Sequence, residues 1–228
     1  MGKGKQKDET RWREQEAERL YAMYKLEHQL LAAGYRRIAG VDEAGRGPLA
    51  GPVVAAAAVI PPGTFIVHLN DSKKLTAKQR ELVYEQLLAA KIPYGLGQAS
   101  VEEIDRLNIL NASRLAMMRA VRNLPVKPDF LLIDGHAWSG IDLPHRGVVG
   151  GDACSLSIAA ASVLAKVTRD RLMIQLDQAF PGYGFAKHKG YPTAEHYSAL
   201  ACLGPCPIHR RSFNLHLQLT LEQASSSK

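Results

Sequence analysis

The sequence predicts an α/β protein, in which short buried strands alternate with helices. Two apolar runs of strand length, residues 53–60 and 130–133, are the first observation, because unbroken apolar runs are typical of strands buried on both faces. The second observation is the helical spacing of apolar residues over 76–90, 109–124 and 155–180. Strands that alternate with helices favour a sheet covered by helical layers.

The first 35 residues precede the first predicted strand. Residues 1–10 are charged and small, and we expect them to be disordered. Residues 11–33 carry apolar side chains at near-helical spacing, and Gly34 is expected to end this helix. A helix that docks on the domain is the favoured interpretation, and contact with a substrate is the alternative.

Residues 38–54, IAGVDEAGRGPLAGPVV, form the stretch around which the chain is organised. Residues 38–41 predict a short buried strand that ends at two neighbouring carboxylates, Asp42 and Glu43. Neighbouring side chains of a strand point to opposite faces, so the two acids cannot both belong to the core. Because an unpaired buried carboxylate is costly, this pair requires a cation or solvent.

A glycine-rich loop with one arginine follows this strand. Gly45, Gly47 and Gly51 allow bare backbone to approach another group closely, and Arg46 lies between the first two. A dinucleotide-binding loop is one alternative, but the glycine spacing departs from G-x-G-x-x-G and prolines interrupt the expected helix start. A structural turn with a solvated acidic pair is the other alternative.

The middle of the chain supplies a helix, a strand and two more helices. Thr76 is the expected N-cap of the first helix, and Lys73, in the polar loop before it, is a candidate phosphate contact or a solvated charge. Residues 94–100 predict a strand, after which Ser100 and Glu103 resemble a capping box. The predicted apolar side of the helix over 109–124 consists of Leu110, Leu115, Met118 and Val121.

Two further carboxylates stand near predicted strand ends. The apolar run 130–133 ends on Asp134, and sites in open α/β sheets gather outside strand ends. A short strand at 148–149 leads through two glycines to Asp152, for which capping the following helix is the structural alternative. Asp170 lies inside that helix between two arginines, and we interpret it as a salt-bridge partner.

Basic residues gather in two segments near the C-terminus. Residues 182–192 interleave lysines, including Lys189, with aromatic side chains and glycines. Cations for phosphate and rings for a sugar or base suit a nucleic-acid strand, whereas a structured loop with surface lysines is the alternative. Arg210, in the basic loop 207–213, is a further candidate contact, and residues 225–228 are expected to be disordered.

Composition limits the class of protein. The chain of 228 residues has 29 Lys and Arg against 22 Asp and Glu, a formal net charge of +7 that favours a polyanionic partner. It lacks both a run of about 18 apolar residues, which a membrane span needs, and a secretory signal. Three cysteines in such a chain indicate a reducing, cytoplasmic setting, and Cys202, Cys206 and His209 have no standard zinc-finger spacing.

The acids Asp42, Glu43, Asp134 and Asp152 come from three separate strand-end segments. If these segments converge, the acids form an oxygen-only site suited to Mg²⁺ or Mn²⁺ rather than zinc. Two such ions about 4 Å apart can activate a water and stabilise the leaving oxygen in phosphodiester hydrolysis. A net-basic protein with an acidic metal pocket suits that chemistry.

Over residues 38–213, the chain resembles ribonuclease HII, the type 2 ribonuclease H family. The segments that carry the resemblance are, in order, DEAGRG, NDSK, LLIDG, GGD, AAASVLAKVTRDR, HKGY and PIHRRSF. The resemblance implies a ribonuclease H-like fold, with a mixed five-stranded sheet flanked by helices and a helical C-terminal region. It implies a catalytic domain over residues 36–224. Residues 1–35 depart from the core of the family and resemble the N-terminal extension found in some bacterial members, whose role is open.

The resemblance also implies an activity and a set of roles. The activity is metal-dependent cleavage of RNA in RNA–DNA hybrids and incision 5′ to single ribonucleotides in duplex DNA, leaving 3′-hydroxyl and 5′-phosphate ends. The four acids would bind Mn²⁺ or Mg²⁺. Gly45, Arg46 and Gly47 would sense the 2′-hydroxyl, which distinguishes RNA from DNA at one nucleotide. Tyr191 would lie against the deoxyribose that follows.

Three alternatives to this assignment differ in testable ways. The related type 3 enzymes usually have lysine at the position of Arg46 and a large N-terminal substrate-binding domain. This chain has arginine there and only a short predicted helix before the catalytic domain, so type 3 is rejected. A nucleic-acid-binding protein would use the acids only structurally. A resolvase-like or integrase-like two-metal nuclease would cut substrates that lack a 2′-hydroxyl. We expect a monomer, because no heptad pattern or long exposed apolar stripe is present.

Overall fold

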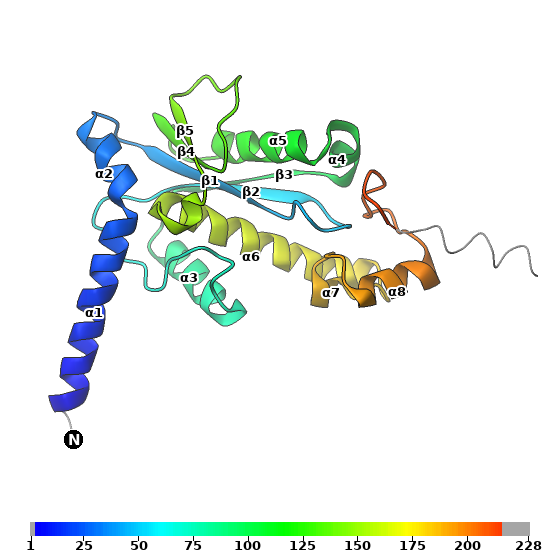
Figure 1. Cartoon of the computed structure of the whole chain (residues 1–228), viewed down its shortest axis with the longest axis horizontal. Helices are drawn as coiled ribbons and strands as arrows, with labels where there is room; N and C mark the ends of the chain where they lie inside the picture. Colours follow the sequence, from blue (N-terminus) through cyan, green and yellow to red (C-terminus); the bar gives the residue numbers. More distant parts are fainter. Residues whose placement is uncertain (1–2, 216–228) are drawn as a thin grey trace, which may run out of the picture.

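A mixed five-stranded sheet forms the centre of the molecule, as the resemblance implied (Figure 1). The computed structural model describes residues 3–215, so the predicted disorder of residues 225–228 lies outside the described residues. The strand order is β3-β2-β1-β4-β5. The strands are β1 (Ile38–Ala44), β2 (Val53–Val59), β3 (Tyr94–Ala99), β4 (Phe130–Asp134) and β5 (His145–Val148).

The strand β1 occupies the middle of this sheet. It pairs antiparallel with β2 and parallel with β4, while β3 and β5 form the two edges. Along β1, Ala39 and Val41 pack into the core beneath α5 (Ile109–Arg122). Because side chains alternate along a strand, Gly40 and Asp42 face the opposite side, toward α6 (Leu156–Ala179).

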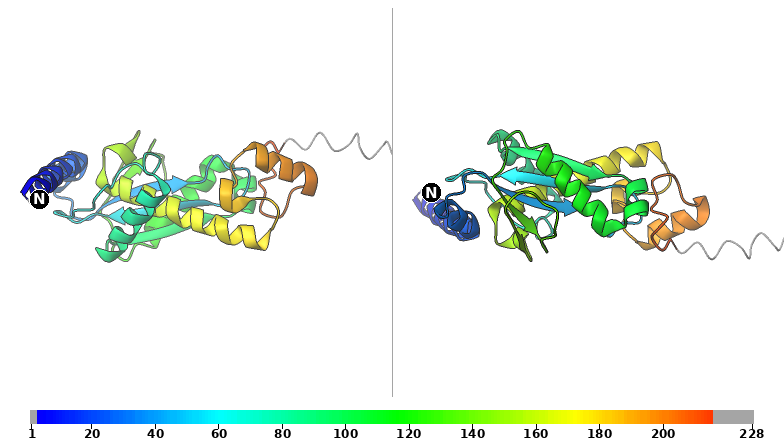
Figure 2. Two further views of the ribbon diagram at one scale, coloured as in Figure 1. Left: turned by 90° about the horizontal axis from the view of Figure 1, so that it is seen from below. Right: turned by 90° about the horizontal axis from the view of Figure 1, so that it is seen from above.

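Helices cover both faces of the sheet, and Figure 2 shows α6 on one face and α5 on the other. The helix α3 (Ala77–Ala89) packs beside α6, and α4 (Val101–Leu107) precedes α5. Gly40 permits the close approach of α6, since a Cβ there would lie 2.0 Å from the carbonyl carbon of Ser157. Thr76 is the N-cap of α3 as predicted, where it forms a capping box with Gln79, and the capping box predicted at Ser100 is present.

The predicted apolar side of α5 was partly wrong. Val121 is buried, but Leu110 is exposed, and the side of α5 that meets the sheet consists largely of alanines. The reason is the close approach of α5 to β3, where a Cβ on Gly97 would lie 2.2 Å from the carbonyl oxygen of Ala116. Larger side chains at this contact would push the helix away from the sheet.

The N-terminal segment is helical from Lys3, which corrects the predicted disorder of residues 1–10 within the described range. The helix α1 (Lys3–Met23) projects from the sheet and is followed by α2 (Lys25–Ala32) (Figure 1). Its first residues are mainly lysine, glutamine and acidic residues, several of which favour helices. Gly34, at φ +101°, follows the end of α2 as predicted.

The C-terminal part of the described chain is helical and packs around the far end of α6. Its elements are α7 (Phe185–His188) and α8 (Ala194–Leu203), and a 3₁₀ turn, η1 (Gly151–Ala153), precedes α6. The segment 182–192 was predicted to offer its aromatic rings to a ligand, but Tyr183 and Phe185 are buried in a core cluster there. Within residues 3–215, no helix is long and apolar enough to cross a membrane.

Candidate active site

Three of the four predicted acids meet at one place. Asp42, Asp134 and Asp152 each offer a carboxylate oxygen, and these oxygens all lie within 4.8 Å of one another. Asp42 lies on the face of β1 that meets α6, Asp134 ends the parallel neighbour β4, and Asp152 lies in η1. The sheet topology therefore brings together carboxylates that are up to 110 positions apart, from residue 42 to residue 152.

Backbone hydrogen bonds hold the acids in this arrangement. Asp134 Oδ1 accepts the N–H of Gly151 at 2.8 Å, which joins the end of β4 to the turn that carries Asp152. Asp42 Oδ1 accepts the N–H of Glu43 at 2.7 Å. Gly151 is confined as well, because a Cβ there would lie 2.5 Å from Cδ1 of Ile158. The cluster is thus fixed by the chain itself.

The electrostatics of the cluster favour a cation. Burial, followed by the charges of Glu43 and Asp134, raises the pKa of Asp42 well above its usual range. Burial also raises the pKa of Asp152, although the ammonium of Lys73 opposes this rise. Carboxylates that repel one another in a partly dehydrated site are stabilised by a divalent ion. A donor set made only of carboxylates fits Mg²⁺ or Mn²⁺.

Glu43 lies beside this group rather than in it. Its Oε1 accepts a hydrogen bond from Arg46 Nη1 at 3.3 Å. Burial raises the pKa of Glu43 and the charge of Asp134 adds to this, whereas Arg46 opposes it. The strand alternation that separates Asp42 from Glu43 accounts for the different directions of the two side chains.

Two fully buried arginines hold the glycine-rich loop. Arg210 Nε donates to the carbonyl oxygen of Gly51 at 2.9 Å, and its Nη1 and Nη2 donate to Arg46 O at 2.9 Å and Gly45 O at 2.6 Å. Arg210 is 0% exposed, so the prediction that it contacts substrate was wrong. All three guanidinium nitrogens of Arg210 donate to backbone carbonyl oxygens. A short basic motif in the sequence does not reveal such buried partners.

Arg169 is the second of these arginines and was not singled out from the sequence. It donates to Pro52 O at 3.0 Å, Ala50 O at 3.1 Å and Lys189 O at 3.1 Å. A Cβ on Gly45, which has φ +96°, would lie 2.0 Å from Arg169 Nε. An arginine on the otherwise apolar side of a long helix was the signal that could have found it.

Tyr191 lies beside this loop, whereas Lys73 and Lys189 are held by partners outside it. The ring of Tyr191 is partly exposed, and a Cβ on Gly47 would lie 3.8 Å from its Cε1. Lys73 Nζ lies 3.3 Å from Asp152 Oδ2, so its ammonium faces the acids in this structure. Lys189 Nζ donates to the carbonyl oxygen of Ala186. Asp170 pairs with Lys166 at 2.7 Å, in agreement with its salt-bridge interpretation.

A chain of neutral histidines lies behind Tyr191. His196 Nδ1 is 3.0 Å from the carbonyl oxygen of Tyr191, so this nitrogen must carry a proton. His196 Nε2 then accepts from His209 Nε2 at 3.0 Å, and His209 Nδ1 accepts the N–H of Cys206 at 3.0 Å. Each ring therefore donates once and accepts on its other nitrogen. The cysteines form no disulfide.

The free energy of unfolding is expected to fall as the pH decreases from about 6.5 to about 4. Burial and the neighbouring His196 lower the pKa of His209 to about 4, whereas an unfolded histidine has a pKa near ~6.5. Between these two pH values the unfolded chain binds a proton at His209 that the folded chain excludes. The free energy of unfolding is therefore lower by about 3 kcal/mol at pH 4 than above pH 6.5.

Urea unfolding at pH 7 and pH 4.5 checks this for the wild type, for His209→Gln and for a control, His136→Gln, at an exposed position. Carboxylates titrate in the same range, so the informative quantity is the difference between variants. His209→Gln should flatten the dependence relative to both other proteins. Equal pH dependence in all three would contradict the assignment of a neutral His209.

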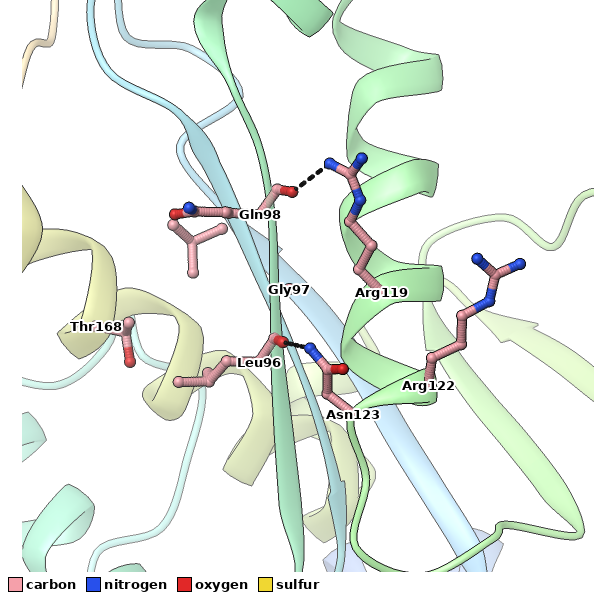
Figure 3. Close-up of a pocket in the computed structure, with 8 residues that line it drawn as sticks. Leu96, Gly97, Gln98, Arg119, Arg122, Asn123 and Thr168 are labelled. Carbon is pink, nitrogen blue, oxygen red and sulfur yellow. Dashed lines mark hydrogen bonds between the residues drawn. The ribbon is translucent and has the colours of Figure 1, made fainter.

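A cavity of about 540 Å³ lies away from the acids, at the edge strand β3 (Figure 3). Arg119 of α5 and Asn123, the C-cap residue of that helix, donate there to the carbonyl oxygens of Gln98 and Leu96, both at 2.8 Å. Its lining residues are Val54, Leu96, Gly97, Gln98, Arg119, Arg122, Asn123 and Thr168. None of the predicted site residues lines this cavity, so it is distinct from the candidate active site.

The fold and the site together define a class of protein: a metal-dependent nuclease with a ribonuclease H-like sheet. The comparisons agree, since the family model described as Ribonuclease HII matches residues 39–216. The chain is 56% identical over 198 residues to the Ribonuclease HII of Moorella thermoacetica, covering 87% of this chain and 96% of that one. It is 59% identical over 191 residues to the Ribonuclease HII of Ruegeria pomeroyi, covering 83% and 81%.

A solved structure shares the fold. The crystal structure of the ribonuclease H2 from Pyrococcus horikoshii superposes with a TM-score of 0.66 at 28% identity, covering 84% of this chain and 100% of that chain. The chain belongs to the ribonuclease HII family. It is a metal-dependent endoribonuclease that acts on RNA–DNA hybrids, and the site of Asp42, Asp134 and Asp152 binds a divalent metal, Mn²⁺ or Mg²⁺.

Proposed function

We propose that this enzyme also incises 5′ to single ribonucleotides embedded in duplex DNA, by two-metal-ion hydrolysis that leaves 3′-hydroxyl and 5′-phosphate ends. The observation that carries the proposal is the juxtaposition of the acids with the glycine loop and Tyr191. Glu43 joins the two groups, because it follows Asp42 in β1 and its side chain bonds Arg46 of the loop. One nucleotide can therefore meet the metal site and the loop together.

The four acids are the proposed ligands of the metal ions. Asp42, Asp134 and Asp152 supply converging oxygens that would hold an ion, and Glu43, whose side chain now bonds Arg46, would complete the quartet. When bound, the ions activate a water and neutralise charge on the leaving 3′-oxygen. The ammonium of Lys73, beside Asp152, is placed to pair with a substrate phosphate when an ion takes over that carboxylate.

Recognition of the ribonucleotide falls to Gly45, Arg46, Gly47 and Tyr191. Arg210 fixes the carbonyl groups of Gly45 and Arg46, so the loop backbone is rigid before substrate arrives. A rigid backbone that lacks side chains suits close reading of a 2′-hydroxyl, which both donates and accepts hydrogen bonds. The half-exposed ring of Tyr191 offers a flat apolar surface to the next deoxyribose. The ammonium of Lys166 lies 5.8 Å from the centre of that ring, and Lys189 is a further candidate phosphate contact.

The protein acts, in this proposal, as a cytoplasmic monomer whose catalytic domain spans residues 36–224. Residues 1–35 are its N-terminal extension. The second helix of that extension, α2, packs through Leu26 and Leu30 against the core cluster that contains Ile38 and Ile158. The extension is therefore joined to the catalytic domain by a shared core rather than by a linker.

Cleavage of a DNA duplex that contains one ribonucleotide, beside an all-DNA duplex of the same sequence, tests the proposal. A single cut 5′ to the ribonucleotide is expected with Mn²⁺ or Mg²⁺ and none with chelator. Cleavage of both duplexes would indicate a general two-metal nuclease. Cleavage of a long hybrid without incision at the single ribonucleotide would restrict the enzyme to hybrids and refute this proposal.

A further inference from the structure

A buried carboxylate from the N-terminal extension reaches the start of α6. Glu27, on α2, is 1% exposed. Its Oε1 accepts hydrogen bonds from Ser155 Oγ at 2.6 Å, from the N–H of Ser157 at 3.0 Å and from Ser157 Oγ at 2.6 Å. Three donors on one oxygen make this the most heavily used contact between the extension and α6 among the hydrogen bonds of the described residues.

The position of these donors explains why an acid stands there. Ser155 is the N-cap of α6, since its Oγ accepts the N–H of Ile158 at 3.2 Å. The first turn of a helix has unpaired N–H groups and a positive dipole end, so it attracts an anion. Glu27 therefore fixes where the helix begins, and α6 cannot shift along its axis without breaking these bonds.

From the start of α6, direct contacts lead to two metal-binding segments. The N–H of Ser155 donates to Gly151 O at 2.8 Å, and the N–H of Gly151 donates to Asp134 Oδ1 at 2.8 Å. Asp152 is the next residue in that turn. On the other side, the backbone of Ser157 lies against Gly40, two residues before Asp42.

We propose that Glu27 is a positioning residue for the metal site. By fixing the first turn of α6, Glu27 holds the turn that carries Asp152 and supports the part of β1 that carries Asp42. It touches none of the three acids and acts only through α6 and the Gly151 turn. The proposal rests on the proposed role of Asp152 as a metal ligand, and it assigns the N-terminal extension a task in metal binding.

The test compares Glu27→Ala with Glu16→Ala by titrating each protein with Mn²⁺ in a calorimeter and by measuring thermal unfolding without metal. Glu16 is a matched control, because it also lies in the extension, is 8% exposed and accepts a backbone N–H, that of His68, at 2.7 Å. Glu27→Ala should weaken Mn²⁺ binding about 10-fold to 100-fold, as loss of outer support for metal ligands does. Glu16→Ala should lower the melting temperature but leave Mn²⁺ affinity unchanged.

Two further variants keep the test decisive. Glu27→Gln retains an acceptor oxygen and should restore most of the Mn²⁺ affinity. Ser157→Ala removes one donor to Glu27 and should weaken binding several-fold, so it serves if Glu27→Ala does not fold. The proposal is overturned if Glu27→Ala and Ser157→Ala lower the melting temperature while Mn²⁺ affinity stays at the wild-type value.

Failure of the assumed metal site would look different. Asp152→Asn is measured in parallel and should weaken Mn²⁺ binding directly. If Asp152→Asn binds Mn²⁺ as the wild type does, the assignment of Asp152 as a ligand fails, and the role of Glu27 fails with it. If Asp152→Asn weakens binding but the Glu27 variants do not, only the positioning role is lost.

Discussion

Asparagine in place of Asp134 is expected to slow hybrid cleavage about 1000-fold or more. The substitution keeps an oxygen that can accept the N–H of Gly151, so the turn beside Asp152 stays in place. It removes one negative charge from a site whose three carboxylates lie within 4.8 Å. Metal ions contribute several kcal/mol to catalysis, and each ~1.4 kcal/mol is a factor of ten in rate. Single-turnover cleavage in Mg²⁺ measures the effect.

The matched control for this variant is Asp129→Asn, at the other end of the same strand. Asp129 accepts the N–H groups of Arg36 and Arg37, both at 2.9 Å, and lies away from the acids. Cleavage by Asp129→Asn should stay near the wild-type rate. Burial, Glu43 and Asp134 together raise the pKa of Asp42, and the substitution removes the charge of Asp134. Without metal, Asp134→Asn should therefore melt at or above the wild-type temperature, because one source of repulsion is gone. Wild-type activity in Asp134→Asn would refute the assignment of this acid.

Methionine in place of Arg210 is expected to destabilise the fold and abolish most activity together. The change leaves carbonyl oxygens of Gly45, Arg46 and Gly51 without their donor in a buried site. An unsatisfied buried polar group costs about 1–3 kcal/mol, so a loss of about 3 kcal/mol or more is expected. For a chain of this size, that lowers the melting temperature by roughly 6–12 °C. Thermal unfolding monitored by circular dichroism measures it.

The neighbouring Arg211 provides the comparison, because its side chain is exposed. Arg211→Met should change the free energy of unfolding by less than about 0.5 kcal/mol. If Arg210 contacted substrate directly, Arg210→Met would instead raise the KM and leave the free energy of unfolding unchanged. If Arg210→Met has wild-type stability and only a raised KM, the prediction from sequence that Arg210 contacts substrate would be restored.

The acids and strands were predictable because each leaves a local signal. An apolar run that meets a carboxylate located both Asp42 and Asp134: Asp134 ends β4 as predicted, whereas Asp42 lies inside β1, which continues to Ala44. The family resemblance supplied the mixed sheet. The roles of Arg210 and Glu27 leave no such signal, because the loop carbonyls that Arg210 binds lie 159 to 165 positions away and the partners of Glu27 lie 128 or more positions away.

By itself, the sequence determined the order of strands and helices, the helix caps and the identity of the acids, since propensity, periodicity and motif spacing act over a few residues. Only the tertiary structure decided which charged side chains face solvent. A basic residue such as Arg210 is indistinguishable from its neighbour Arg211 along the chain, yet one is buried and the other exposed. The difference arises because the glycine loop leaves carbonyl groups in the interior, and a buried carbonyl requires a donor from wherever the fold supplies one.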